Sequence, residues 1–147
     1  PFFDSVEKYA FVAHYMLWKL SAPKKGLKLK YSDVFSDYSC RIGEQDLYFR
    51  NMHGVFSEKK LDAGSQLFLD TIVQKSPQIV LPGGDFLDAG CGAGILSLSL
   101  LKNKIIDGKG LLTDISYSAL LSASLNLRMS GWSDFTVTPT DAADSRQ

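Results

Sequence analysis

Cysteine and net charge are both scarce in this 147-residue sequence. Its two cysteines, Cys40 and Cys91, cannot build a disulfide framework, which favours a reducing intracellular compartment, either the cytoplasm or the mitochondrial matrix. The 16 basic and 16 acidic residues give a formal net charge of +0, so a surface for nucleic acid has to arise from local clustering. No apolar run is long enough to cross a membrane, and the first residues, which lack a Met, show no signal or transit pattern.

The strongest local pattern is an apolar strand followed by a glycine-rich turn and an apolar helix. Residues 86–89 predict the strand, and Gly90, Gly92 and Gly94 follow it. Glycine permits a positive φ and a close approach of a ligand, and the helix start offers unpaired N–H groups. The spacing is not the G-x-G-x-x-G of dinucleotide folds, and no Lys-Ser or Lys-Thr follows, so it is not a P-loop. An ordinary tight connection without a ligand is less favoured, because three glycines in one turn are costly.

Acidic residues are predicted at the ends of three neighbouring strands. Asp88 ends the first strand, where a carboxylate would repel a pyrophosphate but could hold an ammonium group. Asp114 ends a second strand at 110–113, where it could accept both hydroxyls of a ribose. Asp141 follows a third strand at 134–138 and could accept from an adenine amino group, although an ordinary loop acid explains it equally well. S-adenosylmethionine carries an ammonium group and a ribose diol but no phosphate, so the pattern favours this cofactor.

The order of the elements predicts an α/β fold. Strands that alternate with helices indicate a parallel, right-handed sheet of the Rossmann type. The helix after the second strand is expected at 116–129. Another helix, capped by Asp62 or Ser65, is expected before a connection at 76–84. The predicted fold is therefore a Rossmann-like, cofactor-binding half of three parallel strands with helices.

The amino-terminal part predicts different elements. Apolar residues at helical spacing predict a helix from about residue 4 to residue 20. Residues 24–31 alternate four lysines with apolar residues, as on a strand with one wet face; the lysines either contact RNA phosphates or protect a strand edge. A loop at 33–38 and two short strands, at 39–42 and 46–50, are expected next.

Two groups of residues together resemble a known family. Residues 88–94, Asp-Ala-Gly-Cys-Gly-Ala-Gly, resemble the first motif of class I S-adenosylmethionine-dependent methyltransferases. Residues 54–57, Gly-Val-Phe-Ser, and 61–65, Leu-Asp-Ala-Gly-Ser, resemble the small-domain group of that class, whose best-known members methylate the exocyclic amine of guanine in ribosomal RNA. The resemblance covers about residues 47–141. It implies a partial cofactor-binding domain at 46–147, preceded by a helix-and-strand extension at 1–45.

The resemblance also implies roles for individual residues. The methionyl end of the cofactor would lie against Asp88, Gly90 and Gly92, and its ribose against Asp114. Its adenine would pack on Ile115 and meet Asp141 through the amino group. The upstream motif would close the pocket through Phe56, Asp62, Gly64 and Ser65. No metal site is predicted.

One motif of the family is missing from the sequence. Members carry an Asn-Pro-Pro-aromatic run after the fourth strand, which positions the target amine, and these residues contain none. The catalytic residues are therefore unknown, and the first strand would present an open edge. We expect a longer RNA methyltransferase, with further strands or another protein subunit covering that edge. The alternatives are a degenerate methyltransferase-fold subunit or assembly factor of a ribonucleoprotein or mitochondrial complex and, more weakly, a protein-glutamine methyltransferase.

Overall fold

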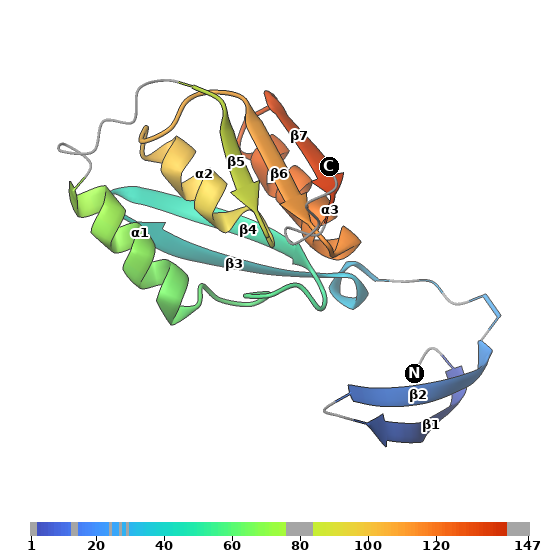
Figure 1. The fold of residues 1–147 in the computed structure, drawn as a ribbon. Coiled ribbons are helices and arrows are strands. Elements are labelled where there is room, and N and C mark those ends of the chain that lie inside the picture. The colour runs from blue at the N-terminus through green and yellow to red at the C-terminus, as the bar shows by residue number, and fades with distance from the viewer. Residues whose placement is uncertain are drawn as a thin grey trace. The chain divides into compact units, whose positions relative to one another are not determined.

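The chain divides into two compact units, Pro1–Lys30 and Tyr31–Gln147 (Figure 1). The first unit is a two-stranded antiparallel sheet of β1 (Phe3–Val12) and β2 (Tyr15–Pro23). The structure is a computed structural model, and it describes residues 3–12, 15–23, 25–26, 28, 30–75 and 84–140.

The predicted helix at residues 4–20 is wrong, because this stretch forms the β1–β2 pair. The pair runs from Phe3 opposite Pro23 to Val12 opposite Tyr15. Aromatic and β-branched residues, which favour strands, are frequent in it: Phe3, Val6, Tyr9, Phe11, Val12, Tyr15 and Trp18. Apolar residues at helical spacing were therefore a misleading signal, since strand-forming side chains occupy many other positions of the same stretch.

The predicted strand at 24–31 is also wrong for the residues that the structure describes there. Lys25 and Gly26 form a turn in which Gly26 has a φ of +71°, and no strand includes Lys28 or Lys30. The positive φ interrupts the extended backbone that an alternating strand needs. The three described lysines of this stretch are exposed, and Tyr31–Asp33 follow them as the 3-10 helix η1.

The second unit contains an antiparallel hairpin of β3 (Phe35–Ile42) and β4 (Gln45–Met52). The two predicted short strands are confirmed, but β3 starts earlier, so the predicted loop at 33–38 is wrong from its third residue onward. One face of the hairpin is buried through Leu47 and Phe49. The predicted domain boundary after residue 45 falls at the start of β4, beside the turn of this hairpin.

A three-stranded parallel sheet follows, in the order β5 (Phe86–Ala89), β6 (Gly110–Asp114) and β7 (Phe135–Pro139). Helix α1 (Ala63–Lys75) precedes the sheet. Helix α2 (Ile95–Lys102) connects the first two strands, and α3 (Tyr117–Met129) connects the last two. These elements confirm the predicted Rossmann-like α/β fold.

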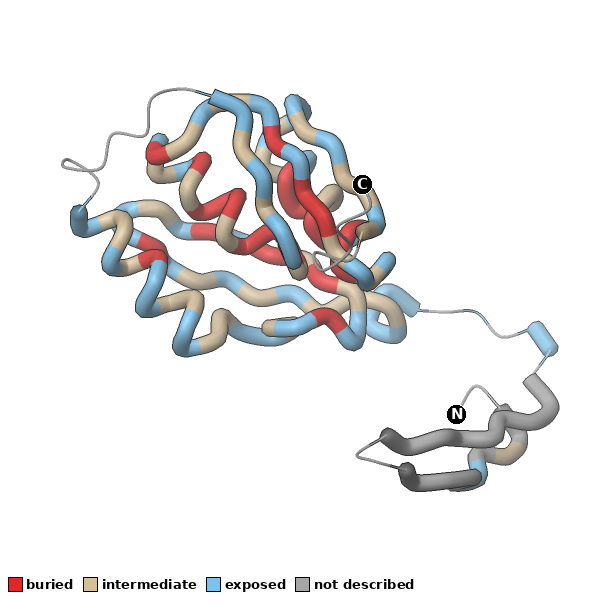
Figure 2. The backbone as a smooth tube through the Cα atoms, in the orientation of Figure 1, coloured by how far each residue is buried: buried red, intermediate tan, exposed pale blue. Residues whose placement is uncertain are grey.

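The core lies between the hairpin, the helices and the sheet (Figure 2). Large apolar side chains from five elements are almost fully buried in it: Phe49, Leu69, Leu98, Leu112 and Leu127. Six polar residues of the described part are buried with them, and three of these join separate elements: Asn51, Ser122 and Asn126. Because burying an unpaired polar group is costly, each of these three needs a partner inside the protein.

The β5 edge and one face of the parallel sheet remain open within the described residues. Strand β5 pairs with β6 alone. The side chains of Leu87 and Leu111 are 63% and 40% exposed, beside a hollow of about 500 Å³ on the same sheet. Coverage of this edge by another subunit stays a prediction. No described helix is long and apolar enough to span a membrane, and no described group of three His, Cys, Asp or Glu residues could hold a metal ion.

Candidate functional site

The turn between β5 and α2 has a backbone that glycine adopts most readily. Gly90, Gly92 and Gly94 have φ values of +73°, +53° and +74°, in the left-handed region. The N–H groups of Gly90 and Cys91 donate to the carbonyl of Thr113 at 2.8 and 2.9 Å, which ties the turn to the end of β6. A Cβ on Gly90 or Gly92 would meet nothing within 4 Å. The turn therefore presents an uncovered backbone that a ligand can approach.

Gly94 and Cys91 have packing roles in the same turn. A Cβ on Gly94 would lie 3.1 Å from the Cβ and 3.2 Å from the Cα of Ala123, so its missing side chain lets α2 and α3 approach each other. Cys91 is buried, and burial, followed by the charges of Asp88 and Asp114, raises the pKa of its thiol to about 12. A neutral, enclosed thiol is a poor nucleophile, so Cys91 fills space.

We expect Gly94→Ala to destabilise the protein more than Gly92→Ala or Gly131→Ala. All three glycines have a positive φ, where a Cβ costs about 1–2 kcal/mol. Only at Gly94 does the added methyl group press against Ala123, which adds about 1–3 kcal/mol of overpacking. The free energies of unfolding in urea measure this difference. Equal losses at Gly94 and Gly131 would contradict the packing role.

Asp88, at the end of β5, lies in an enclosed position that favours a cationic partner. Its Oδ2 accepts a hydrogen bond from Ser97 Oγ at 2.6 Å. Burial raises the pKa of Asp88, the hydrogen bond from Ser97 acts against this, and the negative charge of Asp114 raises the pKa further. The two carboxylates therefore repel each other, and a positively charged ligand group beside them would relieve the repulsion.

Asp114, at the end of β6, holds the glycine turn with both carboxylate oxygens. Its Oδ2 accepts from the N–H of Gly92 at 2.9 Å, and its Oδ1 accepts from the N–H of Ser116 at 2.8 Å. Each oxygen has a second lone pair, so both can accept further hydrogen bonds. The N–H of Thr140 donates to the Asp114 carbonyl at 3.2 Å, which brings the end of β7 to this edge. Asp141 lies outside the described residues.

The remaining predicted residues that the structure describes lie after β6, on the segment before α1 and in the first turn of α1. Ile115 and Phe56 are each 74% exposed, although both are large and apolar. Phe56 belongs to the loop of residues 53–62, part of which lines a hollow of about 430 Å³. Ser65 lies in the first turn of α1, where its N–H donates to Asp62 Oδ1 at 3.0 Å, so Asp62 caps the helix as predicted.

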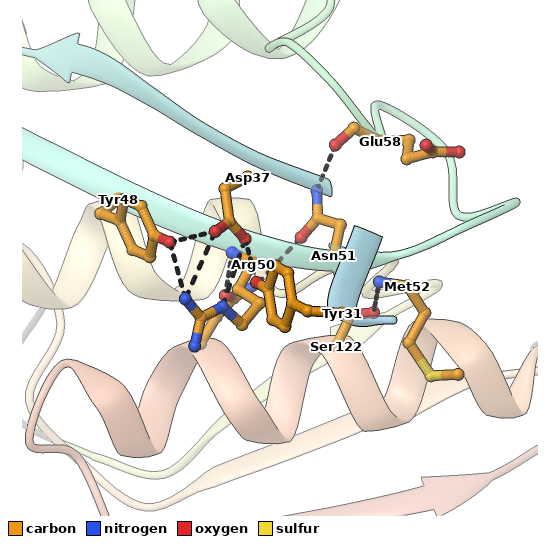
Figure 3. A network of polar contacts seen from close by, with 9 residues as sticks. Tyr31, Asp37, Tyr48, Arg50, Asn51, Met52, Glu58 and Ser122 are labelled. Atoms are coloured by element: carbon orange, nitrogen blue, oxygen red, sulfur yellow. Dashed lines mark hydrogen bonds and ion pairs between the residues drawn. The ribbon is translucent and has the colours of Figure 1, made fainter. Parts of the chain in front are cut away.

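A pair of buried asparagines connects this loop to the glycine turn. Asn51 Nδ2 donates to the carbonyl of Ser57 at 3.3 Å and to the carbonyl of Glu58 at 3.1 Å, and Figure 3 shows the second of these contacts. Asn126 Nδ2 donates to Asn51 Oδ1 at 3.1 Å and to the carbonyl of Ala93 at 3.0 Å. The loop and the glycine turn are therefore joined through two fully buried side chains.

Helix α3 also bonds to the outer edge of β4. The N–H of Arg50 donates to Asn126 Oδ1 at 2.7 Å. The N–H of Met52 donates to Ser122 Oγ at 2.9 Å (Figure 3). These two N–H groups would otherwise be unpaired at the edge of the hairpin. The helix therefore fixes the hairpin, and with it the loop that follows β4.

The exposed face of the hairpin carries a separate polar network (Figure 3). Asp37 accepts hydrogen bonds from the hydroxyls of Tyr31 and Tyr48, both at 2.5 Å, and from Arg50 at 3.2 and 3.3 Å. Burial acts to raise the pKa of Asp37, but these hydrogen bonds hold it at about 2. The Arg50 guanidinium lies 4.7 Å from the centre of the Tyr31 ring. The network ties η1 to both strands of the hairpin.

Four of the predicted site residues lie together, and the loop of residues 53–62 is linked to them through residues that the sequence did not indicate. Asp88, Gly90, Gly92 and Asp114 gather at the carboxyl ends of β5 and β6. The sequence alone did not indicate Ser97, Asn51 or Asn126. One signal was present in α3, where polar residues recur every four positions on an apolar helix: Ser118, Ser122, Asn126 and Ser130.

Comparison with known proteins identifies the family. Residues 46–147, more than half of the chain, match the family described as Methyltransferase small domain. "Ribosomal RNA small subunit methyltransferase C" of Shewanella pealeana is 38% identical over 133 residues, which cover 89% of this chain and 36% of that protein. The protein of the same name from Pseudomonas aeruginosa is 31% identical over 118 residues, covering 80% and 33%. The chain spans about a third of the length of these relatives.

A solved structure has the same fold. The T. thermophilus 16S rRNA N2 G1207 methyltransferase (RsmC), in complex with AdoMet and guanosine, superposes with a TM-score of 0.74 at 20% identity. The superposition covers 99% of this chain and 38% of that one. The predicted resemblance is thereby confirmed at the level of the family. This chain belongs to the methyltransferase small domain family.

Proposed function

We propose that this chain binds S-adenosylmethionine and is part of a methyltransferase that modifies an exocyclic amine of a base in ribosomal RNA. The observation that carries the proposal is the edge where two carboxylates meet an uncovered glycine backbone. The relatives named above are ribosomal RNA methyltransferases, and the solved neighbour is a guanine-N2 enzyme in complex with AdoMet, which supports guanine as the target. We assign cofactor binding to residues 46–147, with residues 1–45 as an extension.

The chemistry of the edge fits this cofactor. Asp88 offers a negative charge to the methionyl ammonium group, and the open backbone at Gly90 and Gly92 leaves room for the methionyl chain. Asp114 keeps lone pairs for the two ribose hydroxyls while it holds the turn. The exposed side chain of Ile115 offers an apolar surface for the adenine. We further propose that Asp141 meets the adenine amino group and that Phe56 and Ser65 close the pocket.

The proposed reaction demands alignment more than acid–base catalysis. The sulfonium of the cofactor supplies an activated methyl group, and transfer to an amine is an in-line displacement, which depends on positioning. The residues of this chain would hold the two ends of the cofactor: Asp88 the methionyl end and Asp114 the ribose. A base inside a duplex would first have to leave the stack.

Calorimetric titration of the chain with S-adenosylmethionine at pH 7 tests cofactor binding. We expect micromolar binding that is lost in Asp88→Ala, because the ammonium group then has no counter-charge. Asp107→Ala is the matched control, since Asp107 is an exposed acid between α2 and β6. Absence of binding by the folded wild-type chain would refute the assignment of the cofactor to this chain.

Methyl transfer is tested with unmodified small-subunit ribosomal RNA and cofactor carrying a labelled methyl group. Label recovered in N2-methylguanine after digestion to nucleosides would support the proposed reaction. Label in a glutamine of an added protein substrate would favour the protein-glutamine reaction instead. Binding without transfer would limit this chain to holding the cofactor, in line with the missing Asn-Pro-Pro-aromatic run.

A further inference from the structure

The imidazole of His53 makes two hydrogen bonds that a neutral ring cannot make together. Its Nδ1 lies 2.7 Å from Glu58 Oε1, and its Nε2 lies 3.0 Å from the carbonyl oxygen of Ser32. A carboxylate and a carbonyl can only accept hydrogen bonds, so both ring nitrogens must donate. A neutral imidazole has one N–H and the imidazolium has two. The geometry therefore corresponds to protonated His53.

Glu58 is the centre of this arrangement. Besides His53, its carboxylate accepts from Ser36 Oγ at 2.8 Å and from the N–H of Gly54 at 2.9 Å. The Gly54 N–H, followed by His53 and Ser36, lowers the pKa of Glu58 to about 2, so it is ionised at every pH of interest. Two other charged groups lie nearby. Lys59 Nζ lies 3.9 Å from Glu58, and its positive charge opposes protonation of the His53 ring. Asp33 belongs to η1 and follows Ser32, whose carbonyl accepts from that ring.

These contacts fix the segment that carries Phe56 and Ser57. The N–H of His53 donates to the carbonyl of Val34 at 3.0 Å, so both the backbone and the ring of His53 tie the start of the loop to the chain before β3. Ser57 has a φ of +58°, a conformation that is uncommon for a residue with a side chain and needs support from its surroundings. Phe56 itself is 74% exposed and packs on little, so its position depends on the contacts of its neighbours in the loop.

We propose that His53 and Glu58 are positioning residues that, through the protonated imidazole, hold residues 53–58 in place and so present Phe56 and Ser57 to the cofactor pocket. Deprotonation removes one of the two ring contacts and loosens the loop. The part of this proposal that concerns the cofactor rests on the proposed function. The part that concerns the loop does not.

The expected pH dependence follows from the direction of the pKa shift. The Ser32 carbonyl, followed by Glu58, raises the pKa of His53 above its ordinary value of 6.5. A raised pKa in the folded state means that the contact is fully formed below pH 6.5 and is lost as the pH rises through the folded-state value. Glu58 does not titrate in this window. The loop should therefore be ordered at pH 6 and looser at pH 8.5.

Nuclear magnetic resonance tests the loop directly. In a His14→Gln background, which leaves one imidazole in the chain, both ring nitrogens of His53 should show imidazolium shifts at pH 6. The amide signals of Phe56 and Ser57 should titrate with the same midpoint, above 6.5. A neutral His53 at pH 6, or loop amides that do not follow its titration, would overturn the proposal whether or not the cofactor binds.

Cofactor affinity tests the consequence for the site. His53→Gln keeps one donor but cannot carry a charge, and Glu58→Gln keeps the shape but loses the carboxylate. We expect wild type to bind S-adenosylmethionine about two- to fivefold more tightly than either variant at pH 6, as for a partly exposed ion pair. The ratio for His53→Gln should approach 1 at pH 8.5. The ratio for Glu58→Gln should fall but stay above 1, because the amide also disturbs the contacts with Ser36 and the Gly54 N–H. A pH dependence common to all three proteins belongs to the ligand's own amine and to Asp88. An affinity ratio that is constant with pH would contradict the role of protonation. If no protein binds S-adenosylmethionine, the proposed function is wrong, and the nuclear magnetic resonance experiment alone decides whether His53 orders the loop.

Discussion

Replacing Asp114 with alanine is expected to weaken S-adenosylmethionine binding about 100- to 10,000-fold. The substitution removes two proposed hydrogen bonds between a carboxylate and the ribose hydroxyls, each worth about 1.5–3 kcal/mol when an ionised group takes part. It also frees the N–H groups of Gly92 and Ser116, which the carboxylate holds at 2.9 and 2.8 Å. The glycine turn then loses the partner that sets its shape. Calorimetric titration at pH 7 measures the loss.

Asp114→Asn separates the loss of the ribose hydrogen bonds from the loss of the contacts that hold the glycine turn. The amide keeps one oxygen acceptor for the turn but replaces the other with a donor, so an intermediate loss is expected. If Asp114→Ala binds the cofactor like wild type, while its fold is intact, then the ribose does not lie at this carboxylate and the proposed pocket is misplaced.

Replacing Asn126 with leucine is expected to lower the free energy of unfolding by about 3–5 kcal/mol. Leucine has a similar size, but it leaves three buried polar groups without their partner: the N–H of Arg50, the carbonyl of Ala93 and Asn51 Oδ1. Each unsatisfied buried group costs about 1–3 kcal/mol, and the costs are not fully additive because the three share one site. Urea unfolding followed by circular dichroism measures the change.

Ser122→Ala is the graded control on the same helix. It removes a single acceptor, for the N–H of Met52 at 2.9 Å, and should cost about 1–2 kcal/mol. A loss at Asn126 no larger than the loss at Ser122 would show that the asparagine pair does not hold the loop and the turn together.

The parts of the fold that the sequence predicted correctly are those with strong local signals. The glycines at 90, 92 and 94 adopt more readily than other residues the positive φ that this turn requires. The acids Asp88 and Asp114 lie at the ends of apolar strands, as predicted. The cap at Asp62 is likewise a local event, three residues from its partner. Each of these depends on neighbours in the chain, so a single sequence is enough to indicate it.

The parts that the sequence missed depend on partners far along the chain. The hydrogen bond from Asn126 to Asn51 spans 75 residues, and neither asparagine differs locally from a surface residue. At residues 4–20 a local pattern was present but predicted the wrong element, a helix. Apolar residues at helical spacing can also belong to two paired strands when aromatic and β-branched residues are frequent. His53 is similar: its two acceptors come from segments 21 and 5 residues away.

The contacts between α3 and the edge of β4 have a geometric consequence. Asn126 and Ser122 are four positions apart, about 6 Å along a helix, and their partners Arg50 and Met52 are two positions apart, about 6.7 Å along a strand. The two distances are nearly equal, so side chains one turn apart on the helix can reach alternate N–H groups of the strand. If β4 slipped by one residue, inward-pointing amides would replace both partners and both contacts would be lost together. The helix thus allows the hairpin only a small set of registers, and the loop beyond Met52 keeps one position relative to the glycine turn.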